Sequence, residues 1–365
     1  MKILIITNHS FMLWQFRREL IEELLKDNEV LISVPFGDHI DDFKRLGCRM
    51  INTELDRRSI NPVKDIGLYR KYRKLLKAER PDMVITYSIK PNIYAGFACR
   101  QMGIPYCVNV QGLGTAFQKP VLANLVTFMY KIALKKAKVV FFENEGNAEE
   151  FRKRKITPAG QQHILPGAGV NLERFAYHAY PHNDKVHFLY LGRIMREKGM
   201  DELFGAAKKL HEESADFVLD LVGFFEDEYK EQVDSLVNDG IAVFHGFQAD
   251  PVPFYTAADC VVLPSYHEGM SNVLLEAAAI GRPIITSDIP GCREAVDNGK
   301  SGLLCKVRNA DSLFEQMRRM LGTSFDERQA MGQAAHEKMV REFDKQWVVS
   351  ETMAAVLGSE KAGVK

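Results

Sequence analysis

The chain has 365 residues, enough for two domains of ordinary size, and its 46% hydrophobic and 26% charged residues are ordinary for a globular protein. Its six cysteines are scattered, with no Cys-x-x-Cys pair and no metal-ligand spacing, which fits a reducing cytoplasm. The apolar first segment, 2–7, is too short for a signal peptide, and no apolar run reaches the roughly 18 residues of a membrane span. Composition therefore favours a cytoplasmic protein that does not cross a membrane.

The charges are unevenly distributed, although the chain as a whole is neutral. Residues 1–180 contain 28 basic and 18 acidic residues, a net charge of +10, and the remainder carries −10. Basic residues crowd segments 57–58, 70–74 and 131–138, and each cluster by itself is typical of a solvated helix face. Together they predict that the N-terminal half binds an anionic membrane surface. The same charge would attract nucleic acid, but no nucleic-acid-binding motif is present.

Strand-like and helix-like segments alternate through the first half of the chain. Periodicity predicts strands at 2–7, 29–34, 82–87, 106–110 and 139–142. It predicts helices at 15–26, 40–46, 92–102 and 122–137. The segment 11–14 is apolar and is interpreted either as core or as a lipid contact. Such alternation predicts an α/β fold, with a parallel sheet covered by helices on both faces.

The second half shows the same alternation of strands and helices after an irregular linker at 166–181. Strands are predicted at 186–191, 217–222, 242–244, 260–263 and 283–286, and a last helix at 346–357. The chain therefore predicts two doubly wound, Rossmann-like domains facing across a cleft. Such domains bind ligands at the carboxyl ends of their strands.

Two glutamates, Glu268 and Glu276, follow one of these predicted strands. The first lies in a strand-to-helix loop and the second about one turn into a helix at 273–280, which Ser271 or Asn272 can cap. The N-terminus of that helix would suit a phosphate, and Glu276 could reach back past it to a ribose. Glu268 would then face a sugar. By themselves, two such glutamates are more typical of a solvated helix start.

Two cations follow the first strand of the second half. Arg193 and Lys198 lie five residues apart in the loop after 186–191, where they could converge on a diphosphate. They would stabilise a leaving nucleoside diphosphate without a metal ion. An ordinary basic loop is the alternative interpretation.

The segment 265–277 resembles the Glu-x7-Glu signature of glycosyltransferase family 4, retaining enzymes of the GT-B fold, and Arg193 and Lys198 match the Arg and Lys pair of that family. The resemblance implies an N-terminal acceptor-binding domain at 1–170 and a nucleotide-sugar-binding domain at 171–344. It also implies that a C-terminal helix at about 345–365 packs back on the first domain. No metal ion and no cofactor are expected.

The resemblance also assigns roles to individual residues. The catalytic residues would be Glu268, Arg193 and Lys198. The donor would contact Glu276, Gly269, Met270, Ser271, Asn272, Val273, Gly223, Phe247 and Gln111. Gln111 stands where many relatives carry a histidine, so no histidine base is expected there. The acceptor side would include His9 and Lys90.

Segments 59–62, 88–91 and 111–115 resemble a branch of the family that makes capsules, exopolysaccharides and lipid-linked glycans. The expected reaction moves a hexose, N-acetylhexosamine or uronic acid from a UDP-sugar to a polyprenyl-diphosphate saccharide at the inner membrane face. Two alternatives remain: a UDP-sugar 2-epimerase of the same architecture, and a non-catalytic subunit of a polysaccharide complex. An NAD-dependent oxidoreductase is disfavoured because no G-x-G-x-x-G follows the first strand.

Overall fold

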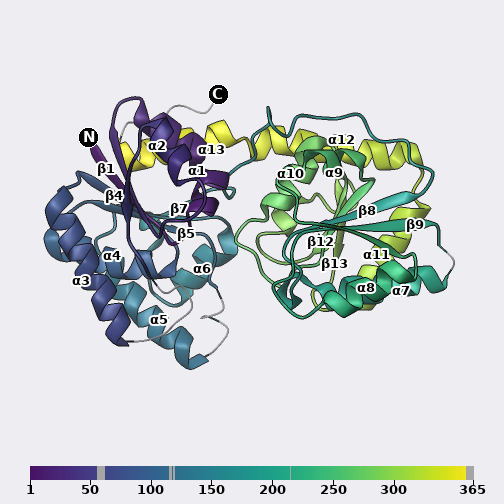
Figure 1. Cartoon of the computed structure of the whole chain (residues 1–365), viewed down its shortest axis with the longest axis horizontal. Helices are drawn as coiled ribbons and strands as arrows, with labels where there is room; N and C mark the ends of the chain where they lie inside the picture. Colours follow the sequence, from purple (N-terminus) through teal and green to yellow (C-terminus); the bar gives the residue numbers. More distant parts are fainter. Residues whose placement is uncertain (56–61, 115–116, 118–119, 214, 359–365) are drawn as a thin grey trace. The chain divides into compact units, whose positions relative to one another are not determined.

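A computed structural model describes residues 1–365 except 56–61, 115–116, 118–119, 214 and 359–365. The basic pair 57–58 and most of the segment 59–62 lie outside these described residues. The chain divides into two compact units (Figure 1): unit 1 contains Met1–Ala168 and Gln346–Lys365, and unit 2 contains Gly169–Lys345.

The described part of unit 1 contains a parallel seven-stranded sheet in the order β3-β2-β1-β4-β5-β6-β7. This order places β1 and β4 at the centre, so that the chain winds outward in both directions, as in a doubly wound fold. The strands are β1 (Lys2–Ile6), β2 (Glu29–Val34), β3 (Arg49–Asn52), β4 (Met83–Tyr87), β5 (Tyr106–Val110), β6 (Val139–Phe142) and β7 (Gln162–Ile164).

Both faces of this sheet are covered because successive strand residues point to opposite sides. Ile3 and Ile5 pack in one core cluster with α1, α2 and α13, whereas Leu4 and Ile6 pack in another with α3, α4, α5 and α6. These helices are α1 (Ser10–Leu25), α2 (Ile40–Leu46), α3 (Pro62–Glu79), α4 (Ile89–Met102), α5 (Pro120–Ala133), α6 (Glu145–Lys153) and α13 (Lys345–Leu357).

Unit 1 differs from the sequence prediction in several places: α3 and α6 were not predicted, and α5 ends at Ala133 and not at residue 137. β3 and β7 were not predicted because they are short outer strands with polar, partly exposed residues. Helix α1 begins at Ser10 and not at residue 15. Its buried side includes a charged residue, Arg17, which interrupts the apolar pattern and is compensated by Glu143 at 2.7 Å.

Unit 2 contains, within its described residues, a parallel six-stranded sheet in the order β10-β9-β8-β11-β12-β13. Its strands are β8 (Val186–Leu191), β9 (Phe217–Val222), β10 (Ala242–Gly246), β11 (Cys260–Leu263), β12 (Ile284–Ser287) and β13 (Gly302–Cys305). The sequence did not predict β13, which is short and begins with a glycine. That glycine is required, because a Cβ on Gly302 would lie 2.3 Å from the Ile284 carbonyl oxygen.

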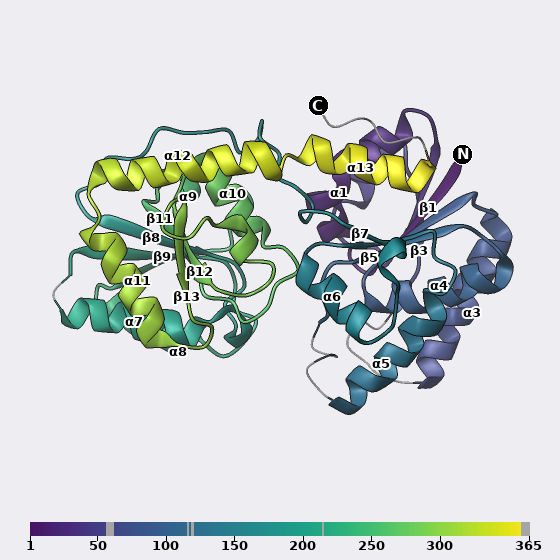
Figure 2. The ribbon, with the colours of Figure 1, turned by 180° about the vertical axis from the view of Figure 1, so that it is seen from behind.

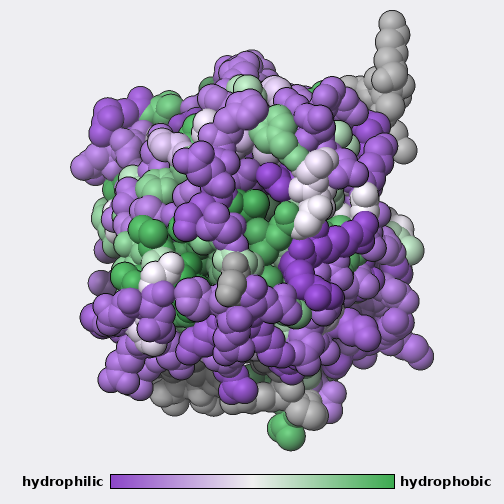
Figure 3. Space-filling view, turned by 90° about the vertical axis from the view of Figure 1, so that its right-hand side faces the viewer, coloured by the Kyte–Doolittle hydropathy of each residue, from purple (hydrophilic) through white to green (hydrophobic). Residues whose placement is uncertain are grey.

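Figures 1 and 2 show α9, α10 and α12 on one face of this sheet and α7, α8 and α11 on the other. The helices are α7 (Met200–Glu212), α8 (Lys230–Asn238), α9 (Val252–Ala257), α10 (Asn272–Ile280), α11 (Ala310–Gly322) and α12 (Phe325–Glu342). Hydrophilic residues cover most of the molecular face in Figure 3, and hydrophobic residues gather in a smaller area near its middle. Because helices cover both of its faces, the sheet is a buried middle layer.

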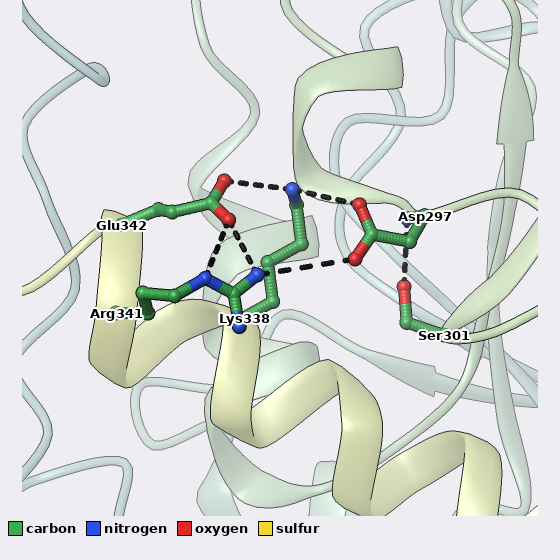
Figure 4. Close-up of polar contacts among 5 residues, drawn as sticks. All are labelled: Asp297, Ser301, Lys338, Arg341 and Glu342. Atoms are coloured by element: carbon green, nitrogen blue, oxygen red, sulfur yellow. Dashed lines mark hydrogen bonds and ion pairs between the residues drawn. The ribbon is translucent and has the colours of Figure 1, made fainter.

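Helix α12 is held against the rest of unit 2 at two points. A Cβ on Gly332 would lie 2.1 Å from the Gly281 carbonyl oxygen, so α12 crosses the end of α10 at backbone contact. Near its C-terminus the buried Lys338 donates hydrogen bonds to Asp297 at 2.9 Å and to Glu342 at 2.7 Å (Figure 4). Burial disfavours the charged amine, but these two hydrogen bonds outweigh it and raise the pKa of Lys338.

Candidate active site

The carboxyl edge of the unit 2 sheet is formed by backbone segments in very close contact. Gly192 and Gly223 follow β8 and β9, and a Cβ on Gly223 would lie 1.8 Å from the Gly192 carbonyl oxygen. Gly223 has a φ of +151° and donates its N–H to the Gly246 carbonyl at 2.9 Å. Side chains larger than hydrogen are therefore excluded at Gly223, and the strand ends form one continuous backbone surface.

Lys198 lies at this edge on a short 3-10 turn, Arg196–Lys198. The turn is pressed onto the end of β11, because a Cβ on Gly199 would lie 2.2 Å from the Pro264 carbonyl oxygen. From here the ammonium group of Lys198 donates a hydrogen bond to Glu268 Oε1. The two side chains are only 19% and 14% exposed, so the fold holds this ion pair largely away from water.

Arg193 occupies a more open position on the same edge. Its side chain is 47% exposed and forms an ion pair with Glu226 at 3.7 Å. Its backbone is fixed, since the Tyr190 hydroxyl donates to the Arg193 carbonyl at 2.5 Å. Burial, with a further contribution from Glu268, raises the pKa of Tyr190, whereas Arg193 acts to lower it. Tyr190 thus lies close to both charged groups and remains a protonated hydrogen-bond donor.

The loop of Glu268, Gly269 and Met270 leads into α10. Ser271 occupies the N-cap position of this helix, but its side chain makes no capping hydrogen bond, so the expected side-chain cap is wrong. Instead the Ser271 N–H donates to the Gly291 carbonyl at 2.9 Å. Gly291 has a φ of +85°, and a Cβ there would lie 2.5 Å from the Gly269 carbonyl oxygen. Backbone contacts therefore position the segment that continues into Asn272 and Val273.

Glu276 is buried within α10 and only 9% exposed. Its Oε2 accepts a hydrogen bond from the Tyr255 hydroxyl at 2.9 Å. Burial raises the pKa of Glu276 to about 7, and the Tyr255 hydrogen bond and the charges of Arg174 and Lys345 oppose that rise. Tyr255 lies on α9 and was not identified from the sequence, where nothing distinguishes it from an ordinary core aromatic.

Two exposed phenylalanines follow neighbouring strands of the same edge. Phe247 after β10 is 59% exposed and Phe224 after β9 is 45% exposed. Their ring centroids are 6.2 Å apart in a T-shaped arrangement. Sequence analysis identified Phe247 only; the apolar pair directly after Gly223 was the available signal for Phe224. The edge thus combines two cations, the carboxyl groups of Glu226, Glu268 and Glu276, and an exposed aromatic pair.

The three unit 1 residues named from the sequence lie at the carboxyl edge of its sheet. Gln111 is half-buried directly after β5. His9 is the N-cap residue of α1, without a side-chain capping bond, and its ring lies 6.3 Å from that of Phe11. Lys90 near the start of α4 forms an ion pair with Asp65 of α3 at 2.8 Å.

A buried amide network holds this edge together. Asn92 accepts from the Thr86 hydroxyl at 2.7 Å and donates to the Asn109 carbonyl at 2.8 Å, which joins the ends of β4 and β5. The network therefore holds the end of β5 two residues before Gln111. Among the described residues of both units, no three His, Cys, Asp or Glu side chains are grouped so as to hold a metal ion.

Comparison with protein families matches both halves of the chain. Residues 177–338 match the model described as glycosyl transferases group 1, and residues 16–168 match the glycosyl transferase 4-like domain. An N,N'-diacetylbacillosaminyl-diphospho-undecaprenol alpha-1,3-N-acetylgalactosaminyltransferase of Campylobacter jejuni is 30% identical over 341 residues, which cover 88% of this chain and 89% of that protein. The chain belongs to glycosyltransferase family 4.

Other comparisons agree with this family. A UDP-Gal:alpha-D-GlcNAc-diphosphoundecaprenol alpha-1,3-galactosyltransferase of Escherichia coli is 30% identical over 312 residues, covering 79% of this chain and 78% of that protein. The structure of Anabaena HepE in complex with UDP and glucose aligns with a TM-score of 0.79 at 15% identity, covering 99% of this chain and 100% of that one. The fold is therefore GT-B, as the sequence predicted, and the protein is a glycosyltransferase.

Proposed function

We propose that this glycosyltransferase moves a hexose, N-acetylhexosamine or uronic acid from a UDP-sugar to a polyprenyl-diphosphate-linked saccharide, with retention of anomeric configuration and without a metal ion or cofactor. The product would serve capsule, exopolysaccharide or related glycan synthesis. The observation that carries the proposal is the ion pair of Lys198 and Glu268, which lies beside the N-terminal end of α10 at the carboxyl edge of unit 2.

In this proposal the cations of unit 2 bind the donor diphosphate. Lys198 and Arg193 neutralise the negative charge that develops on the leaving UDP, and the backbone N–H groups from Gly269 to Val273 complete its surroundings. Glu276 binds ribose hydroxyls through Oε1, while Tyr255 holds Oε2. The backbone beside Gly223 and Phe247 contacts the base, and Phe224 adds apolar surface there.

The proposed chemistry occurs on one face of the transferred sugar. The bond between the anomeric carbon and the UDP oxygen breaks as the acceptor hydroxyl oxygen bonds to that carbon, and its proton passes to the departing phosphate. Glu268 stabilises the positive charge at the anomeric carbon, and Gln111 binds a sugar hydroxyl. The names of both relatives specify an alpha linkage, and an α-linked donor such as UDP-galactose yields this by retention.

The acceptor and its location are inferred from the relatives and from charge. Both relatives are named for acceptors that carry a sugar on diphosphoundecaprenol. The N-terminal half of the chain, with a net charge of +10 in residues 1–180, would attract an anionic bilayer at the inner membrane face. His9 and Lys90 are placed on the acceptor side, and no nucleic-acid partner is proposed.

The direct test is UDP release from a panel of nucleotide sugars with a lipid-diphosphate-linked monosaccharide as acceptor, in EDTA and in magnesium. We expect turnover in EDTA and an α-configured product by NMR. Lys198→Ala serves as the inactive variant. Lys185→Ala is the matched control, because Lys185 forms an exposed ion pair with Asp216 at 2.9 Å just before β8, at the opposite edge of the sheet. Activity lost in EDTA and restored by magnesium would refute metal independence.

The rival function, a UDP-sugar 2-epimerase, is separated by omitting the acceptor. The transferase leaves UDP-N-acetylglucosamine unchanged when it is the sole substrate, whereas an epimerase converts it to the 2-epimer. Conversion without acceptor would replace the proposed reaction.

A further inference from the structure

Helix α5 exposes a row of large apolar side chains on the side turned away from the core. Val121 is 86% exposed, Leu125 49% and Phe128 60%, and their spacing of four and three residues places them on one helix face. The opposite side contributes buried residues to the core of unit 1, namely Ala123, Val126, Tyr130 and Ala133. One apolar face therefore anchors α5, and a second apolar face is presented to the surroundings.

The charged residues within α5 and directly after it are all positive and lie at one end of the row. From Val121 to Tyr130 the sequence contains no charged residue, and Lys131 is exposed in the last turn. Lys135 and Lys136 follow directly after the helix and are also exposed. Apolar side chains next to lysines suit the boundary between acyl chains and anionic headgroups.

The neighbouring helices extend this basic character. α5 packs beside α4, and α4 packs beside α3, on the same face of the unit 1 sheet (Figures 1 and 2). The described part of α3 carries five exposed cations: Arg70, Lys71, Arg73, Lys74 and Lys77. The layer thus combines an apolar row on α5 with a basic surface on α3.

The length of α5 determines how this helix can contact a bilayer. Its 14 residues extend about 21 Å, which is shorter than the hydrocarbon core of about 30 Å. Among the described residues, no helix is long and apolar enough to cross a membrane. A helix of this kind lies in the plane of the interface.

We propose that α5 inserts the side chains of Val121, Leu125 and Phe128 into the interfacial region of an anionic bilayer, with Lys131, Lys135 and Lys136 on its phosphates. This inference deepens the proposed function, on which it rests for the lipid-linked acceptor. A second copy of the chain is the less suitable occupant. Three side chains on one helix are small against the roughly 800 Å² that each partner of a stable complex buries, and α5 offers no anion to those lysines.

The other lipid-contact candidate from the sequence, segment 11–14, is mostly packed within unit 1. Leu13 is only 3% exposed, and Trp14 stacks on His39 with ring centroids 5.3 Å apart. Met12 is the member of this segment with large exposure, at 41%. The structure therefore favours the core interpretation for 11–14 and leaves α5 as the larger apolar surface.

The first test is flotation of the full-length protein with vesicles of phosphatidylcholine containing 30% phosphatidylglycerol. We expect Leu125→Ser with Phe128→Ser to weaken binding about tenfold or more, without lowering the melting temperature, because both side chains are exposed. Val237→Ser with Val340→Ser is the matched control, since these residues of unit 2 are 41% and 50% exposed. Replacing Lys131, Lys135 and Lys136 by serine should abolish the preference for anionic over neutral vesicles. Unchanged flotation of the Leu125 and Phe128 variant would overturn the proposal.

The second test reports insertion directly. The six native cysteines are buried, so a cysteine introduced by Phe128→Cys can be labelled selectively with an environment-sensitive fluorophore. Its emission should shift to the blue with anionic vesicles, whereas the label on Val237→Cys should not respond. A label at position 128 that responds to protein concentration and not to vesicles, together with a dimer that Leu125→Ser and Phe128→Ser dissociate, would assign α5 to a second copy instead.

Activity separates this inference from the proposed function. On a water-soluble, short-chain acceptor the α5 variant should keep wild-type turnover, and on the same saccharide in vesicles it should lose about tenfold. Wild-type protein that floats but transfers no sugar to either acceptor would refute the function and leave the membrane role of α5 standing. Wild-type turnover by the variant on both acceptors would overturn the role of α5 in reaching the lipid-linked acceptor.

Discussion

The carboxyl edges of the two sheets are built from different chemistry, although both sheets are parallel and doubly wound. The unit 2 edge has paired charges and glycines at backbone contact, with Lys198 bound to Glu268 and Gly223 against Gly192. The unit 1 edge has neutral hydrogen bonds between its strand ends, such as that of Asn92 with Thr86, beside the ion pair of Lys90 with Asp65. A diphosphate leaving group demands fixed positive charge, whereas a sugar acceptor demands hydrogen bonds and shape. In the proposed reaction, the closely packed charges at the unit 2 edge supply the electrostatic part.

The largest effect should follow from removing a cation at the unit 2 edge. Lys198→Ala and Arg193→Ala should each lower kcat on the order of 10²-fold or more, because the transition-state charge loses a fixed partner. Steady-state kinetics measure this loss, and circular dichroism checks the fold. Rates within threefold of wild type for both variants would show that the charges of unit 2 do not serve the leaving group.

A second effect concerns how the folding stability of unit 2 depends on pH. Because burial raises the pKa of Glu276 from 4.5 to about 7, the folded protein holds this proton more tightly than the unfolded chain and loses stability as pH rises from about 4.5 to about 7. Glu276→Gln removes this penalty and keeps an oxygen for the Tyr255 hydroxyl. Its stability relative to wild type should therefore increase by about 2–3 kcal/mol between pH 5 and pH 8.

Chemical denaturation at each pH, in which the unfolding transition of unit 2 is monitored, measures that difference in stability. Glu315→Gln on α11 is the control, because it makes the same substitution at a carboxylate that is 52% exposed. An offset between Glu276→Gln and wild type that is equal at both pH values would argue against a buried, titrating carboxyl group.

Substitutions of Glu268 and Glu276 should change the kinetics in different ways. Glu268→Gln should mainly lower kcat, about tenfold, because its charge acts on the developing positive charge of the sugar. Glu276→Ala should mainly raise the donor KM and weaken UDP binding about tenfold, since ribose is bound before and during reaction. Donor-saturation kinetics and calorimetry with UDP test both. Unchanged UDP affinity in Glu276→Ala, or a change in KM alone in Glu268→Gln, would reverse the assigned roles.

The smallest effect is expected at Gln111, a neutral side chain at the carboxyl edge of unit 1. Gln111→Ala should lower kcat/KM about five- to tenfold, which corresponds to one neutral hydrogen bond of about 1 kcal/mol. Gln101→Ala near the end of α4 provides a matched control on the opposite edge of the sheet. A loss at Gln111 as large as that at Lys198 would remove the contrast between the two edges.

The sequence alone determined the elements whose pattern is local. The strands at 29–34, 106–110, 139–142, 186–191, 217–222 and 260–263 agree with the structure to the residue, because buried parallel strands are continuous apolar runs between turn residues. The same local sequence patterns also predicted the loops that contain Lys198 and Glu268. The outer strands β3, β7 and β13 were not predicted, since their short segments acquire strand structure from the neighbour they pair with.

Only the tertiary structure decided how distant residues meet. The pairing of Lys198 with Glu268 joins residues 70 positions apart, and the hydrogen bond from Tyr255 to Glu276 links two helices. The exposure of Val121, Leu125 and Phe128 also depends on packing, since the apolar pattern of α5 is the same whether it faces a core or a solvent. Local sequence determines periodicity and turns, whereas burial, and with it pKa and surface chemistry, is set by which elements the fold brings into contact.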